Sequence, residues 1–203
     1  MNISHLRRVA VPSPLLVLVA VFSTAACEPQ PTPEPEAAAP PAPVETPQPA
    51  TTTLTDPEIV MIVMTANSVD SANGEMARQR AENPQVRQFG ERMVADHSRL
   101  NQQAARLAQQ LNVTPQESDV SRQLQQTGQQ TRDQLGQLSG ADFDRTYMQG
   151  EISLHQNVLD MIDTTLLPNA QNPELRSLLE EARPIIQSHL EQARQIQGQL
   201  AAR

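Results

Sequence analysis

Apolar side chains recur at steps of three and four residues through most of the chain after residue 55. Within residues 92–111 the residues that share one face of such a helix are Met93, His97, Leu100, Ala104, Leu107 and Leu111. This region shows no alternating strand pattern and contains few glycines. The pattern therefore predicts an all-α domain over residues 55–203.

Helix start signals divide this domain. The stretches TDPE (55–58) and TPQE (114–117) fit capping boxes, and the pairs Asn83-Pro84 and Asn172-Pro173 place asparagine at a helix N-cap with proline at the first helical position. Together with the apolar periodicity they predict helices over 56–82, 84–111, 115–138, 141–166 and 173–201.

Four of these helices have similar lengths, about 40 Å at 1.5 Å per residue, as a four-helix bundle requires. The remaining one, 115–138, is rich in glutamine and has few apolar residues at helical spacing. We expect it to lie outside the bundle as a crossover, which lets the helices 84–111 and 141–166 run parallel.

Each of the four long helices carries a polar residue on its apolar face, close to its midpoint. These residues are Asp70, His97, His155 and His189. Each lies within about two residues, or roughly 3 Å of axial rise, of the middle of its helix, so aligned helices would bring them into one layer. One carboxylate and three imidazoles form a ligand set suited to a single zinc, iron, copper or manganese ion.

Two further acidic residues adjoin this layer. Glu151 lies one turn before His155, and Asp96 precedes His97 directly. Either carboxylate could orient a ligand ring or add a ligand. A buried network of the same side chains could instead fix the register of the helices without any metal, and both interpretations are open at this point.

The first 26 residues have the features of an export signal. Arg7 and Arg8 precede the short apolar run LLVLVAVF, and small residues follow up to Cys27. A lone cysteine after Thr24, Ala25 and Ala26 resembles the lipobox of bacterial lipoproteins, although leucine is usual where Thr24 stands. We therefore expect Cys27 to be acylated; ordinary secretion with cleavage near Ala26 is the alternative.

Residues 27–54 are predicted to be a disordered linker after the lipidated cysteine. Nine of the 17 prolines fall in residues 28–50, together with four glutamates and no basic residue. At about 3.1 Å per residue this stretch could hold the helical domain roughly 70 Å from a membrane. We therefore expect the protein to be exported and anchored by Cys27 in the cell envelope, at the outer membrane. Its helical domain would face the periplasm.

Charge and composition exclude several functions. The chain has a net charge of −8, no lysine and only 2% aromatic residues. Nucleic-acid binding needs positive charge to displace counterions, and single-strand binding needs aromatic rings for stacking. We therefore expect no nucleic-acid partner.

The order of the motifs NSVD (67–70), FGERMVADH (89–97), FDRTYMQGEISLH (143–155) and RPIIQSHL (183–190) resembles a family of exported bacterial proteins of unknown function. Its members are often labelled outer-membrane proteins and are grouped with the ferritin-like superfamily. The resemblance covers about 56–200. It implies a ferritin-like helical bundle and no established activity.

The di-iron signature of ferritin-like enzymes is absent from this sequence. That signature is a glutamate three residues before a histidine, and the residues at this spacing are Val94, Ile152 and Ile186. We expect no di-iron enzyme activity, whereas a mononuclear metal site remains open. The alternative function is a metal-free interaction or stress-protective module of the envelope, which would contact an unidentified protein partner through residues 115–138.

Overall fold

Every regular element that the computed structural model describes, over residues 53–202, is helical. The elements are α1 (Asp56–Arg80), α2 (Pro84–Gln110), α3 (Asp119–Gly136), α4 (Gly140–Met161), one π-helical turn η1 (Ile162–Leu166), the short α5 (Leu167–Asn169) and α6 (Pro173–Ala201). The all-α prediction is confirmed. The expected signal peptide, Cys27 and nearly all of the linker lie outside the described residues.

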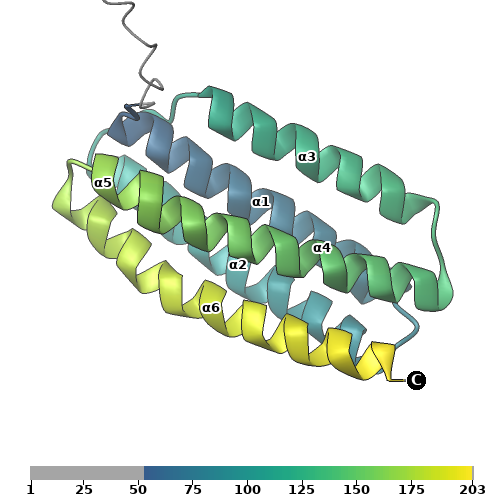
Figure 1. Ribbon diagram of the computed structural model, residues 1–203. Helices are drawn as coiled ribbons and strands as arrows, with labels where there is room; N and C mark the ends of the chain where they lie inside the picture. The colour runs from purple at the N-terminus through teal and green to yellow at the C-terminus, as the bar shows by residue number, and fades with distance from the viewer. Residues whose placement is uncertain (1–52, 203) are drawn as a thin grey trace, which may run out of the picture. The chain divides into compact units, whose positions relative to one another are not determined.

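Helices α1, α2, α4 and α6 form an antiparallel bundle, and α3 lies on its outside against α1 (Figure 1). In the chain, α3 follows α2 and precedes α4, and it runs back along the length of the bundle. Helices α2 and α4 therefore point in the same direction (Figure 1), as the sequence predicted. None of the helices between residues 53 and 202 is long and apolar enough to cross a membrane.

The predicted starts of α1, α2 and α6 are correct. The carboxylate of Glu58 accepts from the backbone N–H of Thr55 at 2.9 Å, and the side chains of Asn83 and Asn172 accept from backbone N–H groups in the first turns of α2 and α6. These contacts satisfy donors that have no partner inside the helix.

The predicted start of the crossover helix is wrong. The TPQE stretch does not begin it, because Ser118 is the N-cap. The hydroxyl of Ser118 accepts from the backbone N–H of Ser121, and the backbone N–H of Ser118 donates to the hydroxyl of Ser121. The preceding loop is held in place because the N–H of Gln116 donates to the carbonyl oxygen of Pro57 in α1, at 3.1 Å. The helix predicted over 141–166 also differs, because α4 ends at Met161 and continues as the π turn η1.

Two glycines allow α1 and α2 to approach closely. A Cβ atom on Gly90 would lie 2.6 Å from the carbonyl oxygen of Gly74 and 2.8 Å from Cβ of Ala77. Any larger residue would push the helices apart. This crossing lies about one turn from Asp70 and two turns from His97, so it sets the spacing of the two helices beside the polar layer.

The apolar core is divided into two clusters by that layer. One cluster includes Ile59, Leu107 and Leu175, towards the start of α1, and the other includes Phe89, Phe143 and Ile196, towards its end. Ten polar or charged residues in the described part of the chain are buried, and half of them are Asp70, His97, Glu151, His155 and His189. The polar layer is therefore enclosed by apolar packing at both ends.

Candidate metal centre

The structure brings together the four residues that the sequence placed in one layer. Asp70 comes from α1, His97 from α2, His155 from α4 and His189 from α6. All four are buried, with at most 3% of their surface exposed. The centroids of the three imidazole rings lie 5.2–5.6 Å apart, so the rings form a nearly equilateral triangle.

One nitrogen of each ring faces a common point. The three histidines offer ligand atoms that all lie within 4.8 Å of one another. Oδ2 of Asp70 lies 3.3 Å from Nε2 of His97 and 3.6 Å from Nε2 of His155. Ligand atoms around a tetrahedral ion with bonds of about 2.0–2.1 Å are about 3.3 Å apart, so the Asp70 contacts already have that spacing.

The other nitrogen of each ring contacts an oxygen atom. Nδ1 of His97 lies 2.9 Å from Oδ1 of Asn67, and Nδ1 of His155 lies 2.9 Å from the backbone oxygen of Glu151. Nε2 of His189 lies 2.8 Å from Oδ2 of Asp96. Metal-binding histidines commonly donate their outer N–H to a carbonyl or carboxylate in this way.

These outer contacts determine which nitrogen carries the hydrogen. A backbone carbonyl oxygen and an ionised carboxylate can only accept, so Nδ1 of His155 and Nε2 of His189 must donate. The inner nitrogens of these two rings are then lone pairs, and with Oδ1 of Asn67 as acceptor the same holds for His97. Nε2 of His97, Nε2 of His155 and Nδ1 of His189 have no hydrogen-bond partner within residues 53–202.

This arrangement fits a cation better than a hydrogen-bond network. Three nitrogen lone pairs converge, and the carboxylate of Asp70 lies beside those of His97 and His155. None of the three nitrogens can donate to another while the rings are neutral. Buried nitrogen acceptors without donors are costly, whereas a divalent ion between the rings would satisfy the three of them together. The donor set of three imidazoles and one carboxylate suits a transition metal.

Burial keeps two of the rings neutral. Desolvation lowers the pKa of His97, and the attraction of Asp70 only partly opposes it. Desolvation likewise lowers the pKa of His189 to about 4, although its hydrogen bond to Asp96 acts in the opposite direction. Both rings are therefore in the neutral form that binds metal ions at neutral pH.

Glu151 behaves differently from Asp70, its neighbour in the layer. Burial raises the pKa of Glu151 well above its usual range, and the nearby charge of Asp70 raises it further. Burial alone would also raise the pKa of Asp70, but its electrostatic interactions with His97 and His155 and a hydrogen bond with Glu151 hold it below its usual value. Two close buried carboxyl groups thus divide into a neutral Glu151 and an ionised Asp70.

The two further acidic residues predicted beside the layer, Asp96 and Glu151, have different places. Asp96 lies on the outer side of His189, with a quarter of its side chain exposed, and it also contacts Arg92 and Arg99. Glu151 contacts the layer directly, because its Oε2 lies 3.7 Å from Nδ1 of His155 and it forms a second compact group with Asp70 and His155.

Asn67 holds the ring of His97 and was not among the predicted site residues. Asn67 is buried and lies three positions before Asp70, so both side chains are on the same side of α1. This spacing from Asp70 was the one feature of the sequence that could have placed Asn67 beside the layer. An asparagine is not a typical metal ligand, so its role emerges only from its contact with His97.

Comparisons with known proteins give a family and a fold. The sequence profile of a domain of unknown function (DUF4142) matches residues 40–196. Among solved structures, one similar protein is CopM in the Cu(II)-bound form, with 18% sequence identity, a TM-score of 0.56, and coverage of 72% of this chain and 98% of that chain. At this identity the likeness shows a shared fold alone. No curated protein matches the sequence significantly.

Proposed function

The chain belongs to a family defined as a domain of unknown function (DUF4142), and from its buried layer of three histidines and one aspartate we propose that it binds a single transition-metal ion. His97, His155 and His189 would bind through their inner nitrogens and Asp70 through a carboxylate oxygen. Asp96 and Asn67 would orient two of the rings. The observation that carries this proposal is that three histidine nitrogens converge and have no hydrogen-bond partner within the described residues.

Divalent copper is the ion that this site should hold most tightly. Imidazole suits zinc, iron, copper and nickel, and sites of mixed nitrogen and oxygen donors bind Cu²⁺ more strongly than the other divalent ions of the first transition row. The similar fold of CopM in its Cu(II)-bound form is compatible with this choice. Zinc, iron and manganese are the other candidates.

Metal analysis of the purified protein tests the proposal. The protein should be expressed without a histidine tag in cells supplied with Cu²⁺, Zn²⁺, Fe²⁺ and Mn²⁺, and analysed for its metal content. We expect close to one transition-metal ion per chain. The variants His155→Gln and His189→Gln should lose the ion and remain helical by circular dichroism, whereas Asp160→Asn, an exposed carboxylate on α4, should keep it.

Thermal unfolding gives an independent measurement. An ion that binds only the folded state at 100 times its Kd adds about 2.7 kcal/mol to the free energy of unfolding. For a domain of this size that corresponds to a rise in Tm of roughly 5–10 °C. A metal-free wild type whose Tm is unchanged by each of the four ions would refute metal binding and leave the structural network as the role of the layer.

We also propose that the bundle is ferritin-like and that Cys27 anchors it in the bacterial envelope, facing the periplasm. The long crossover between α2 and α4 supports the first statement. The signal-like N-terminus with its lone cysteine supports the second. Labelling of cells with palmitate should mark the wild type and spare Cys27→Ser. Equal labelling of both, or recovery of the wild type in the soluble fraction, would contradict the anchor.

A further inference from the structure

The four proposed ligands are buried, so an ion can reach them only after some part of the bundle moves. His97 borders open space at one of the grooves on the bundle. It contributes to the wall of a groove of about 360 Å³ between α1 and α2. The other residues of that wall are Asn67, Ser68, Ser71, Ala72, Glu75, Val94, Ser98 and Asn101.

The wall of this α1–α2 groove is mostly polar and includes the small side chains of Ser68, Ser71 and Ser98. The hydroxyl groups of Ser71 and Ser98 lie 3.2 Å apart across the two helices, and the amide of Asn101 donates to the hydroxyl of Ser68 at 3.3 Å. Hydroxyl and amide oxygens can replace some of the water around a hydrated cation as it leaves solvent. Small side chains leave room for a neighbouring ring to turn.

His97 is also held differently from the other two rings. Nδ1 of His155 donates to the backbone of its own helix, which is fixed. His189 donates to Asp96, which is itself held by Arg92 and Arg99. Within residues 53–202 the one hydrogen bond of the His97 ring goes to the side-chain oxygen of Asn67, and Asn67 lines the same groove.

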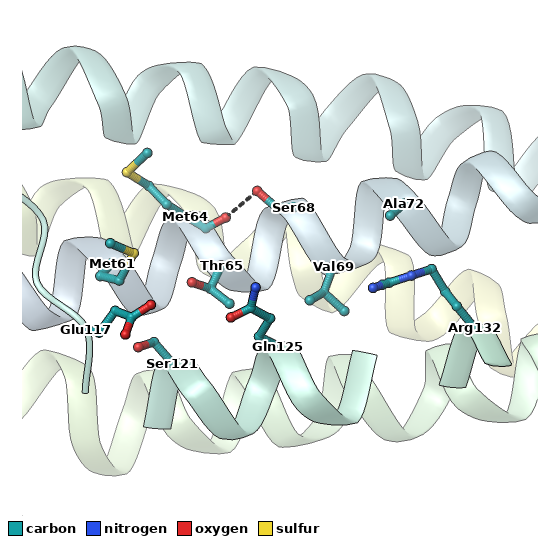
Figure 2. Close-up of a pocket in the computed structure, with 10 residues that line it drawn as sticks. All are labelled: Met61, Met64, Thr65, Ser68, Val69, Ala72, Glu117, Ser121, Gln125 and Arg132. Carbon is teal, nitrogen blue, oxygen red and sulfur yellow. Dashed lines mark hydrogen bonds between the residues drawn. The ribbon is translucent and has the colours of Figure 1, made fainter. Parts of the chain in front are cut away.

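The neighbouring surfaces are less suited to admit a cation. On the side of α2 and α6, Arg92 donates to Ser188 and Gln192 and lies with Arg99 over Asp96, so positive charge covers that face. A second groove along α1, towards α3, is lined by residues such as Met61, Thr65 and Gln125 (Figure 2), and none of the four ligands is among them.

We propose that the metal ion enters through the α1–α2 groove and that His97 is the ligand that opens, by releasing Asn67 and turning its ring towards Ser71 and Ser98. This inference rests on the proposed metal binding. Asn67 is then a positioning residue, because its hydrogen bond returns the ring of His97 to the closed centre and slows release of the ion.

Uptake kinetics of matched serine variants test the route. Ser98 adjoins His97 and lines the groove, whereas Ser188 adjoins His189 on the face covered by arginine; both serines are partly buried. Cu²⁺ should be mixed rapidly with the full-length apo-protein and its uptake followed by visible absorption. Ser98→Leu should slow uptake about tenfold or more, while Ser188→Leu should not. The affinity of Ser98→Leu at equilibrium should stay within about threefold of the wild type, since its ligands are intact.

The reverse reaction tests Asn67. With a chelator in excess, Asn67→Ala should release Cu²⁺ about 10–100 times faster than the wild type, which is the usual effect of losing the partner of a ligand ring. Asn67→Asp, which keeps an acceptor oxygen, should restore slow release. A purely structural role for Asn67 would lower the Tm of the apo-protein without this acceleration or this rescue.

The possible failures are distinguishable. If the wild type binds no Cu²⁺ at equilibrium, the proposed function fails and the route fails with it. If the wild type binds Cu²⁺ but Ser98→Leu takes it up at the wild-type rate, only the route is wrong, and slower uptake by Ser188→Leu would place it between α2 and α6. Should Ser98→Leu fail to fold, Ser71→Leu on the opposite wall provides the same test.

Discussion

Nε2 of His155 lies 3.6 Å from Oδ2 of Asp70, and neither atom has a hydrogen to donate to the other. The hydrogen of the His155 ring is on Nδ1, where the backbone oxygen of Glu151 accepts it. A carboxylate and an imidazole lone pair that face each other in a buried layer repel unless a cation or a donor lies between them. A metal centre and a hydrogen-bond network therefore predict different effects when Asp70 is replaced.

Replacing the carboxylate of Asp70 by an amide should have opposite effects on the apo-protein and on metal binding. In Asp70→Asn the new N–H₂ group can donate to Nε2 of His97 or His155, and one buried hydrogen bond contributes about 0.5–1.5 kcal/mol. We expect the Tm of the apo-protein to rise by roughly 2–5 °C, measured by circular dichroism. The same variant should bind Cu²⁺ at least about tenfold more weakly, measured by titration. A lower apo Tm together with unchanged affinity would show that Asp70 is not the anionic ligand.

The hydrogen bond between Asp96 and His189 should control affinity without direct contact between Asp96 and the ion. In Asp96→Asn an N–H₂ group can take the place of the accepting carboxylate oxygen. The ring of His189 must then rotate or carry its hydrogen on the inner nitrogen. We expect metal affinity to fall about 10–100-fold while the stoichiometry stays at one ion per chain. Titration calorimetry measures both quantities, and Asp133→Asn on the outer helix α3 is the matched control. Loss of all binding in Asp96→Asn would instead make Asp96 a ligand.

Acid should destabilise the apo-protein through its buried histidines. The pKa of His189 is about 4 in the folded state, below the 6.5 of an exposed histidine, because burial disfavours the charged ring. Between these two values the unfolded chain binds the proton more readily, so the free energy of unfolding falls as pH drops from about 6.5 to 4. At 1.36 kcal/mol per pKa unit the loss from His189 approaches about 3 kcal/mol.

Urea unfolding at pH 7.0, 5.5 and 4.5 measures this loss. His189→Gln, which cannot take up a proton at that position, should lose clearly less stability over the same range. The lowered pKa of His97 acts in the same direction, so some dependence on pH should remain in the variant. If wild type and variant lose stability equally, the ring of His189 does not have the lowered pKa.

A methyl group at Gly90 should disturb both the helix crossing and the metal layer. Its Cβ would lie 2.6 Å from the carbonyl oxygen of Gly74, so α1 and α2 would have to separate. We expect Gly90→Ala to lower the free energy of unfolding by about 1–3 kcal/mol, measured by urea unfolding. Metal affinity should fall as well, because His97 and Asp70 lie on the two helices that move apart.

Gly198 supplies the control for that variant. It lies within α6, and a Cβ added there meets no atom within 4 Å. Gly198→Ala should therefore raise stability by about 0.5–1 kcal/mol, since alanine is the better helix former. An equal effect of both substitutions would mean that the close approach at Gly74 and Gly90 contributes nothing to the fold.

The sequence by itself determined the helices and the height of each ligand along them. The apolar periodicity and the N-caps Thr55, Asn83 and Asn172 depend only on local spacing and local hydrogen bonding, so they could be read without the fold. The midpoints of four helices of similar length were enough to place Asp70 and the three histidines at one level. The metal binding inferred from this layer stays a prediction, as does the lipid anchor at Cys27.

Only the tertiary structure decided what that layer can do. The choice of ring nitrogen that faces inward depends on partners from the rest of the fold, Asn67 from α1 for His97 and Asp96 from α2 for His189. The start of α3 at Asp119 depends on a loop held against α1, and the pKa of His189 depends on apolar packing from several helices. Spacing along the chain specifies which residues share a level of the bundle, whereas the direction and protonation of each side chain are set by neighbours that are distant in sequence.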